Sequence, residues 1–206
     1  MFFAPGFEEV EALAPLDLLR RAGLNVKTVA IGGAPTSSSG LFDTAAPGIS
    51  VSETAVTGAH GITIHADMSE ASFCRYAAEH LSGPNPDSIE AVVLPGGMPG
   101  TSNLDASPVV DHTLEIAHSM GAFLCAICAA PLVLGKRGYL TGKRATCYPG
   151  FETYLEGATV GGKVIRDGKI ITAAGMGVAQ EFGLELISVL VSPEKAGEIR
   201  TAIQSL

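Results

Sequence analysis

Short apolar runs alternate along the chain with segments whose apolar residues recur every three or four positions. The runs predict strands, and the longer period predicts amphipathic helices. We expect strands over residues 2–4, 24–31, 48–53, 61–66, 89–97, 121–127 and 144–148, and a hairpin over 163–175 that turns at Asp167 and Gly168. We expect helices over residues 7–23, 68–81, 107–119, 128–136, 150–157, 178–190 and 193–206, and a long loop over 32–48.

Strands that alternate with helices are typical of a doubly wound, mostly parallel α/β sheet with helices on both faces. The pattern has no internal repeat and no second core, so we expect one domain over residues 1–206. In such sheets the functional site lies where the strands end, at their carboxyl edge.

Composition and charge make several classes of protein unexpected. Hydrophobic residues make up 47% of the chain, and the formal net charge is −8. The acidic balance makes a nucleic-acid surface unexpected, because phosphate binding needs clustered Lys and Arg. No apolar run reaches the length of a membrane span, and the acidic first segment lacks the basic start of a signal peptide. Four cysteines form no disulfide framework, so we expect a reducing, cytoplasmic setting.

The segment "AFLCAICAAP" places Cys125 and Cys128 three positions apart. A redox pair, a zinc knuckle and two inert core cysteines are the alternatives. A redox pair needs the first cysteine at a helix start, whereas Cys125 lies inside an apolar run. Zinc needs further ligands, but Cys74 and Cys147 are isolated and the histidines form no spaced pair. We therefore expect no metal, and Cys125 is best explained as core packing.

Cys128 has a different setting, because small residues follow it where a buried strand must turn into a helix. Ala126, Cys128 and Ala130 form the sulfur counterpart of the Gly-x-Ser-x-Gly nucleophile elbow. A cysteine at a helix N-terminus is stabilised as a thiolate, so this pattern predicts a reactive Cys128 with a lowered pKa.

The segments "APGFEEVEA", "VVLPGG", "CAICAAP" and "GVAQEFGLELI" resemble the DJ-1/ThiJ/PfpI superfamily, in the branch of the parkinsonism-associated deglycase. The resemblance spans residues 1 to about 192. It implies a flavodoxin-like fold of the class I glutamine amidotransferase-like type. It also implies a homodimer with Arg21 at the interface, although Arg21 is equally explained as an ordinary charge at a helix C-terminus.

The same resemblance implies roles for individual residues. Cys128 matches the nucleophile and Glu11 its partner carboxyl, whose alternative is a solvated charge on a helix face. Backbone N–H groups of Gly97 and Ala129 match an oxyanion hole. The pocket implied by the resemblance comprises Gly96, Tyr148, Gly175, Met176 and Gly177.

Two positions depart from the family pattern. Ala129 stands where the peptidase branch has histidine, so a peptidase is not expected. Tyr148 stands where animal members of the deglycase branch have histidine, and a neutral phenol cannot act as a base near pH 7. Met176 replaces a proline of the family's glycine loop, either to line the pocket or to pack.

The function implied is a cysteine-dependent enzyme that acts on small reactive carbonyls. It would convert methylglyoxal to lactate as a glyoxalase III-type enzyme, or remove glycation from proteins. We expect no cofactor, since no dinucleotide motif follows the first strand. The alternative is a sensor of oxidative stress, or a chaperone, that acts through oxidation of Cys128. A third reading, thiazole-monophosphate metabolism, has no phosphate loop to support it.

Overall fold

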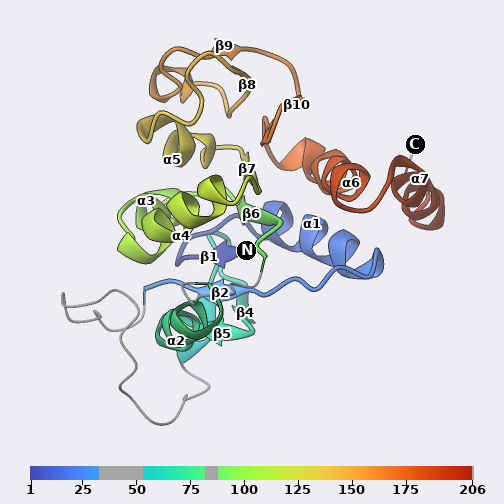
Figure 1. The fold of residues 1–206 in the computed structure, drawn as a ribbon. Coiled ribbons are helices and arrows are strands. Elements are labelled where there is room, and N and C mark those ends of the chain that lie inside the picture. The colour runs from blue at the N-terminus through green and yellow to red at the C-terminus, as the bar shows by residue number, and fades with distance from the viewer. Residues whose placement is uncertain (33–52, 82–87, 206) are drawn as a thin grey trace.

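Parallel strands form the middle of the protein in a computed structural model that describes residues 1–32, 53–81 and 88–205 (Figure 1). One ladder has the order β1-β2-β5, and the other has the order β10-β11-β7-β6. Strands β1 and β6 are in contact, so the two ladders lie side by side. Every pair in these ladders is parallel except β10 with β11. The strands are β1 (Phe2–Phe3), β2 (Val29–Ala30), β5 (Met68–Ser69), β6 (Ala91–Leu94), β7 (Phe123–Ile127), β10 (Val164–Asp167) and β11 (Ile170–Ala173).

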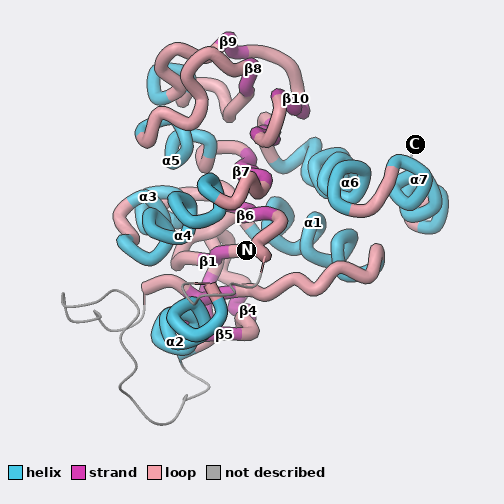
Figure 2. The backbone as a smooth tube through the Cα atoms, in the orientation of Figure 1, coloured by secondary structure: helices cyan, strands magenta, loops and turns pink. Residues whose placement is uncertain are grey.

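Helices cover both faces of these strands, as the α/β prediction requires (Figures 1 and 2). Successive residues of a strand point to opposite faces, so Leu124 and Cys125 belong to different core clusters. One cluster joins the strands to α2 (Glu70–His80), α3 (Gly100–Asp105), α4 (Pro108–Ser119) and α5 (Pro131–Lys136). The other joins them to α1 (Glu9–Arg21), α6 (Ala179–Leu190) and α7 (Pro193–Ala202). The predicted fold class is confirmed.

Serine caps begin three of these helices. Ser69, Ser107 and Ser192 each accept a hydrogen bond from the backbone N–H three residues further on. Such caps satisfy backbone donors that have no partner inside the helix. Helix α1 instead begins with a carboxylate, because Glu8 accepts from the Glu11 N–H at 2.9 Å.

Two hairpins lie outside the parallel ladders or at their edge. The hairpin of β10 and β11 is confirmed with its predicted turn, and Gly168 there has a φ of +60°. A second hairpin pairs β3 (Ala55–Thr57) with β4 (Thr63–His65). Strand β4 was predicted, within the strand expected over 61–66. Most of the strand expected over 48–53 as its partner lies outside the described residues, and so does the loop at 33–48.

Several predicted elements are shorter than expected. The strand expected over 24–31 is paired only at Val29–Ala30, because its neighbour β1 offers two residues for pairing. The strand expected over 144–148 is paired only as β8 (Arg144–Ala145), with β9 (Thr159–Val160). The short helix expected over 150–157 is the 3₁₀ turn Glu152–Tyr154. Helix α3 was missed, since its six residues carry too little periodicity.

Candidate active site

Cys128 lies in a sharp turn directly after β7. Its φ is +63°, in the left-handed region that few residues with a side chain adopt. The turn is held on both sides: the Cys128 N–H donates to the Ala173 carbonyl at 2.8 Å, and the Tyr148 N–H donates to the Cys128 carbonyl at 2.7 Å. Left-handed strain of this kind costs about 1–3 kcal/mol and is typical of functional sites. The geometry is that of a nucleophile elbow.

The fold brings Glu11 to this cysteine across 117 positions of sequence. Glu11 lies in the first turn of α1, its side chain is 1% exposed, and its carboxyl group is hydrogen-bonded to the Cys128 thiol. The Gly96 N–H donates to Glu11 Oε2 at 3.1 Å, and the Met176 N–H also donates to this carboxyl. Glu11 is therefore a buried partner of the thiol and not a solvated charge on a helix face.

Burial raises the pKa of Glu11 to about 7. The hydrogen bond from Cys128 acts in the opposite direction, the negative charge of Glu8 raises the pKa further, and the N–H groups of Gly96 and Met176 lower it. Burial prevails because an ionised carboxylate loses its hydration there. This carboxyl therefore holds its proton to a higher pH than an exposed glutamate does.

The predicted lowering of the Cys128 pKa is wrong. Burial, the negative charge of Glu11 and the hydrogen bond to Glu11 raise the pKa of Cys128 to about 12, although the N–H groups of Ala129 and Gly97 oppose them. Helix α5 begins only at Pro131, so the thiol lies outside its first turn. Two groups this close titrate as a pair. When Glu11 is ionised, its negative charge keeps the proton on the thiol. A thiolate at Cys128 becomes favourable only when the Glu11 carboxyl is protonated and therefore neutral.

Glycines make room for this pair. A Cβ atom on Gly96 would lie 2.6 Å from Glu11 Oε2 and 2.7 Å from Cys128 Cβ. Gly97 has a φ of +88°, and a Cβ there would overlap the backbone of Glu8. A side chain at either position would therefore separate α1 from the elbow.

The remaining predicted pocket residues differ in how close they lie to the thiol. A Cβ on Gly175 would lie 3.4 Å from Tyr148 Cδ2 and 4.0 Å from Cys128 Sγ. The side chains of Tyr148 and Met176 are 51% and 54% exposed, so Met176 does not pack into the core. A Cβ on Gly177 would have no neighbour within 4 Å, which places this glycine away from the crowded centre.

The other cysteines contribute no partner for Cys128. Cys125 belongs to β7 and is fully buried in the core cluster that includes α6, and burial raises its pKa. Burial also raises the pKa values of Cys74 and Cys147 to about 11. All four cysteines are free, and Cys128 is the one that is not buried. This supports a single accessible thiol over a redox pair.

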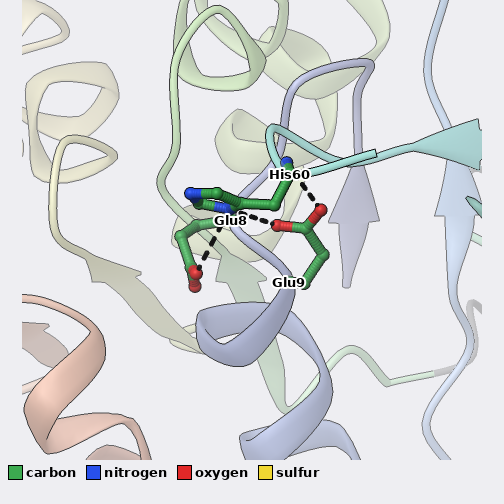
Figure 3. A group of neighbouring side chains, drawn as sticks. All are labelled: Glu8, Glu9 and His60. Atoms are coloured by element: carbon green, nitrogen blue, oxygen red, sulfur yellow. Dashed lines mark hydrogen bonds and ion pairs between the residues drawn. The ribbon is translucent and has the colours of Figure 1, made fainter. Parts of the chain in front are cut away.

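One group of side chains in the described part of the chain could hold a metal ion: Glu8, Glu9 and His60 (Figure 3). The Glu9 carboxylate already accepts from the His60 backbone N–H at 2.8 Å and lies 2.9 Å from His60 Nδ1. Burial opposes ionisation of Glu9, yet these hydrogen bonds hold its pKa below the usual value. The group is satisfied as it stands and ties the turn after β3 to the start of α1.

Sequence reasoning missed this contact because 51 positions separate Glu9 from His60, and nothing in either segment signals the other. Two cavities of about 300 and 390 Å³ also lie elsewhere, and neither is lined by Cys128 or Glu11. Arg21, the predicted interface residue, is exposed and pairs with Asp17 at 2.6 Å. Throughout residues 1–32, 53–81 and 88–205, no helix combines the length and the apolarity that crossing a membrane requires.

A cysteine at the tip of a central strand, with a buried carboxyl on its thiol, defines a class of α/β proteins built on a nucleophile elbow. The chain belongs to the DJ-1/PfpI family, whose sequence profile matches residues 1–189. Protein dj-1beta of Drosophila melanogaster is 32% identical over 206 residues, which cover 97% of this chain and 92% of the relative.

Solved structures agree with this assignment. The crystal structure of Drosophila DJ-1beta matches with a TM-score of 0.79 at 31% identity and covers 100% of this chain and 96% of its own. A further relative, the glutathione-independent glyoxalase DJR-1.2 of Caenorhabditis elegans, is 33% identical over 118 residues. That match covers 54% of this chain and 61% of the relative.

Proposed function

We propose that this protein is a cofactor-independent glyoxalase that converts methylglyoxal and water to lactate through Cys128. The observation that carries the proposal is the hydrogen-bonded pair of Glu11 and Cys128, in which burial raises the pKa of the carboxyl to about 7. A general acid–base works best when its pKa lies near the working pH. Glu11 meets that condition in direct contact with the nucleophile.

The first step joins the thiol to the aldehyde. With the shared proton on Glu11, the Cys128 thiolate attacks the aldehyde carbon, and the carbonyl electron pair moves to oxygen. Glu11 delivers its proton to that oxygen, which completes a hemithioacetal. The N–H groups of Gly97 and Ala129 already face the sulfur, and they lie where they can stabilise negative charge on the adduct.

The second step moves a hydrogen within the adduct. The Glu11 carboxylate removes the proton from the former aldehyde carbon, the resulting enediol is reprotonated at the neighbouring carbon, and a thioester of lactate remains on Cys128. Water then attacks the thioester carbonyl, the thiolate leaves, and lactate is released. Water is the only co-reactant of the conversion. No electron acceptor is needed, because the aldehyde carbon is oxidised while the neighbouring carbonyl carbon is reduced.

The family supports this chemistry, since one of its members carries the name glutathione-independent glyoxalase. Removal of glycation from proteins would use the same nucleophile on a glycated amine. The four free cysteines are compatible with a reducing compartment, and we propose the cytoplasm.

The test is lactate formation from methylglyoxal without glutathione. We expect turnover by the native protein, its loss in Cys128→Ala, and a fall of roughly 10²–10⁴-fold in Glu11→Gln, the usual worth of a positioned acid–base. The rate should rise with pH through about 7, as the pair loses its first proton. Full activity of either variant would refute the mechanism.

A second candidate function is supported by the exposure of Cys128 compared with the other three cysteines. Such a thiol can be oxidised to sulfenic or sulfinic acid, with peroxide as the oxidant. The protein would then act as an oxidation sensor. Inactivity of the native protein on every glyoxal, together with a peroxide-dependent change in partner binding that Cys128→Ala abolishes, would favour this function.

A further inference from the structure

We propose that the site prefers uncharged 2-oxoaldehydes with an apolar substituent larger than methyl, which would pack against Tyr148 and Met176. This inference deepens the proposed glyoxalase function and rests on it for turnover, although the binding preference can be measured without turnover. Its basis is the attachment of these two residues to the reacting pair, their exposure, and the charge of their surroundings.

Tyr148 and Met176 are tied to the reacting groups through their backbones. The Tyr148 N–H donates to the Cys128 carbonyl, and the Met176 N–H donates to the Glu11 carboxyl. The Tyr148 ring lies against Gly175, beside the thiol. The two side chains thus have fixed starting points next to the sulfur, and about half of each is in solvent.

Large apolar side chains exposed to this extent are few in the described part of the chain, and the backbones of two of them are hydrogen-bonded to the reacting pair. We define these two side chains, Tyr148 and Met176, as the apolar rim. An apolar rim beside a reactive group is typical of a site that binds an apolar substituent.

The charged groups that act on the reacting pair are acidic. Glu11 acts on the Cys128 thiol, and Glu8 acts on Glu11. The nearby His60 is engaged by Glu9 (Figure 3). An anionic substituent would therefore meet negative charge with no compensating cation among the groups that act on this pair. The rim favours alkyl substituents, and the charges disfavour carboxylate or phosphate.

The experiment compares isobutylglyoxal with methylglyoxal in steady-state assays of the full chain. We expect kcat/KM to be roughly tenfold higher for isobutylglyoxal, because even one methylene group in apolar surroundings is worth at least about that. Met176→Ala and Tyr148→Ala should each lower this ratio by about threefold or more, mainly through KM for isobutylglyoxal. Met120→Ala is the control, since Met120 is also an exposed methionine and follows the end of α4.

A protection assay separates this inference from the proposed function. Isobutylglyoxal, methylglyoxal and glyoxylate are each tested for slowing the alkylation of Cys128 by iodoacetamide, which requires reversible addition to the thiol but no turnover. We expect protection to follow that order, with glyoxylate weakest. Equal protection by the two glyoxals, or a ratio unchanged in both rim variants, would overturn the inference even if methylglyoxal is turned over. Protection in the expected order without any turnover would refute the proposed glyoxalase function and support the proposed binding preference.

Discussion

Glu11 and Cys128 depend on each other at the scale of single residues. Burial disfavours the ionised form of both groups and therefore raises the pKa of each. Their hydrogen bond lets one proton serve both, so the pair can hold a thiolate beside a neutral carboxyl. Cys128 lies before the first turn of α5, which begins at Pro131, and Glu11 is the charged group that acts on its thiol.

The raised pKa of Glu11 has a consequence for stability. The folded state binds this proton more tightly than the unfolded chain, whose carboxyl has a pKa of about 4.5. The stabilising contribution of Glu11 is therefore complete below pH 4.5 and is lost as the pH rises through about 7. Glu11→Gln, which does not titrate, should gain about 1–3 kcal/mol relative to the native protein between pH 4.5 and 8.

Denaturant unfolding of both proteins across this pH range measures that gain. Glu156→Gln, a change at an exposed glutamate, is the control and should show little change with pH. A constant difference between Glu11→Gln and the native protein from pH 4.5 to 8 would show that Glu11 ionises in the folded state as it does in the unfolded chain.

At the scale of elements, the N-cap and first turn of α1 carry three glutamates with different roles. Glu8 caps the helix, Glu9 ties down the turn after β3, and Glu11 reaches the thiol. Successive residues of a helix point in different directions, so adjacent acids need not share a role. The placement of α1 consequently sets the geometry of the Glu11–Cys128 pair.

Helix α6 fixes the placement of α1 through a close approach at Gly183. A Cβ there would lie 2.8 Å from Leu18 Cδ1 and 3.0 Å from Pro15 Cα. Gly183→Ala should destabilise the fold by about 1–3 kcal/mol, since extra volume in a packed contact forces the helices apart. Because Glu11 lies on the same helix, methylglyoxal turnover should fall as well.

Gly197→Ala in α7 is the matched control for this prediction. It is also a glycine within a helix, but an added Cβ has no neighbour within 4 Å. Alanine there should stabilise the protein by about 0.5–1 kcal/mol through helix propensity alone. Chemical unfolding compares the two variants, and a stabilising effect of Gly183→Ala would contradict the close-contact explanation.

At the scale of the whole molecule, we predict a homodimer through the outer face of α1. Residues Leu16, Leu18 and Leu19 are buried inside the protein, whereas Val10 is 45% exposed on the opposite side, and Arg21 is exposed as well. A second copy could cover this face. Sedimentation at micromolar concentration should give twice the 21.1 kDa of one chain.

Two variants sharpen the dimer prediction. Val10→Glu should shift the mass toward the monomer, because a carboxylate in an apolar interface loses its hydration. Val160→Glu, on a similarly exposed valine in β9, should leave the mass unchanged. A native protein that sediments as a monomer would refute the dimer. The single domain over residues 1–206 likewise stays a prediction.

The alternation of strands and helices, and the turn at Cys128, could be predicted from the chain itself, although β3, β5, β9 and α3 were not. Both follow from local signals: periodicity sets the element type, and small residues around Cys128 mark a turn after a buried strand. Strand lengths were less predictable, because a strand such as β2 extends only as far as its neighbour pairs with it.

The resemblance alone identified Glu11 as the partner of Cys128, since no local signal connects positions 117 apart. The sequence by itself determined the fold class, the turn at Cys128 and the family features. Only the tertiary structure decided the raised pKa of Glu11, the contact of Glu9 with His60, and the exposure of Tyr148 and Met176. The reason is physical: pKa values and exposure depend on which distant segments exclude water from a group, and that is settled only when the chain has packed.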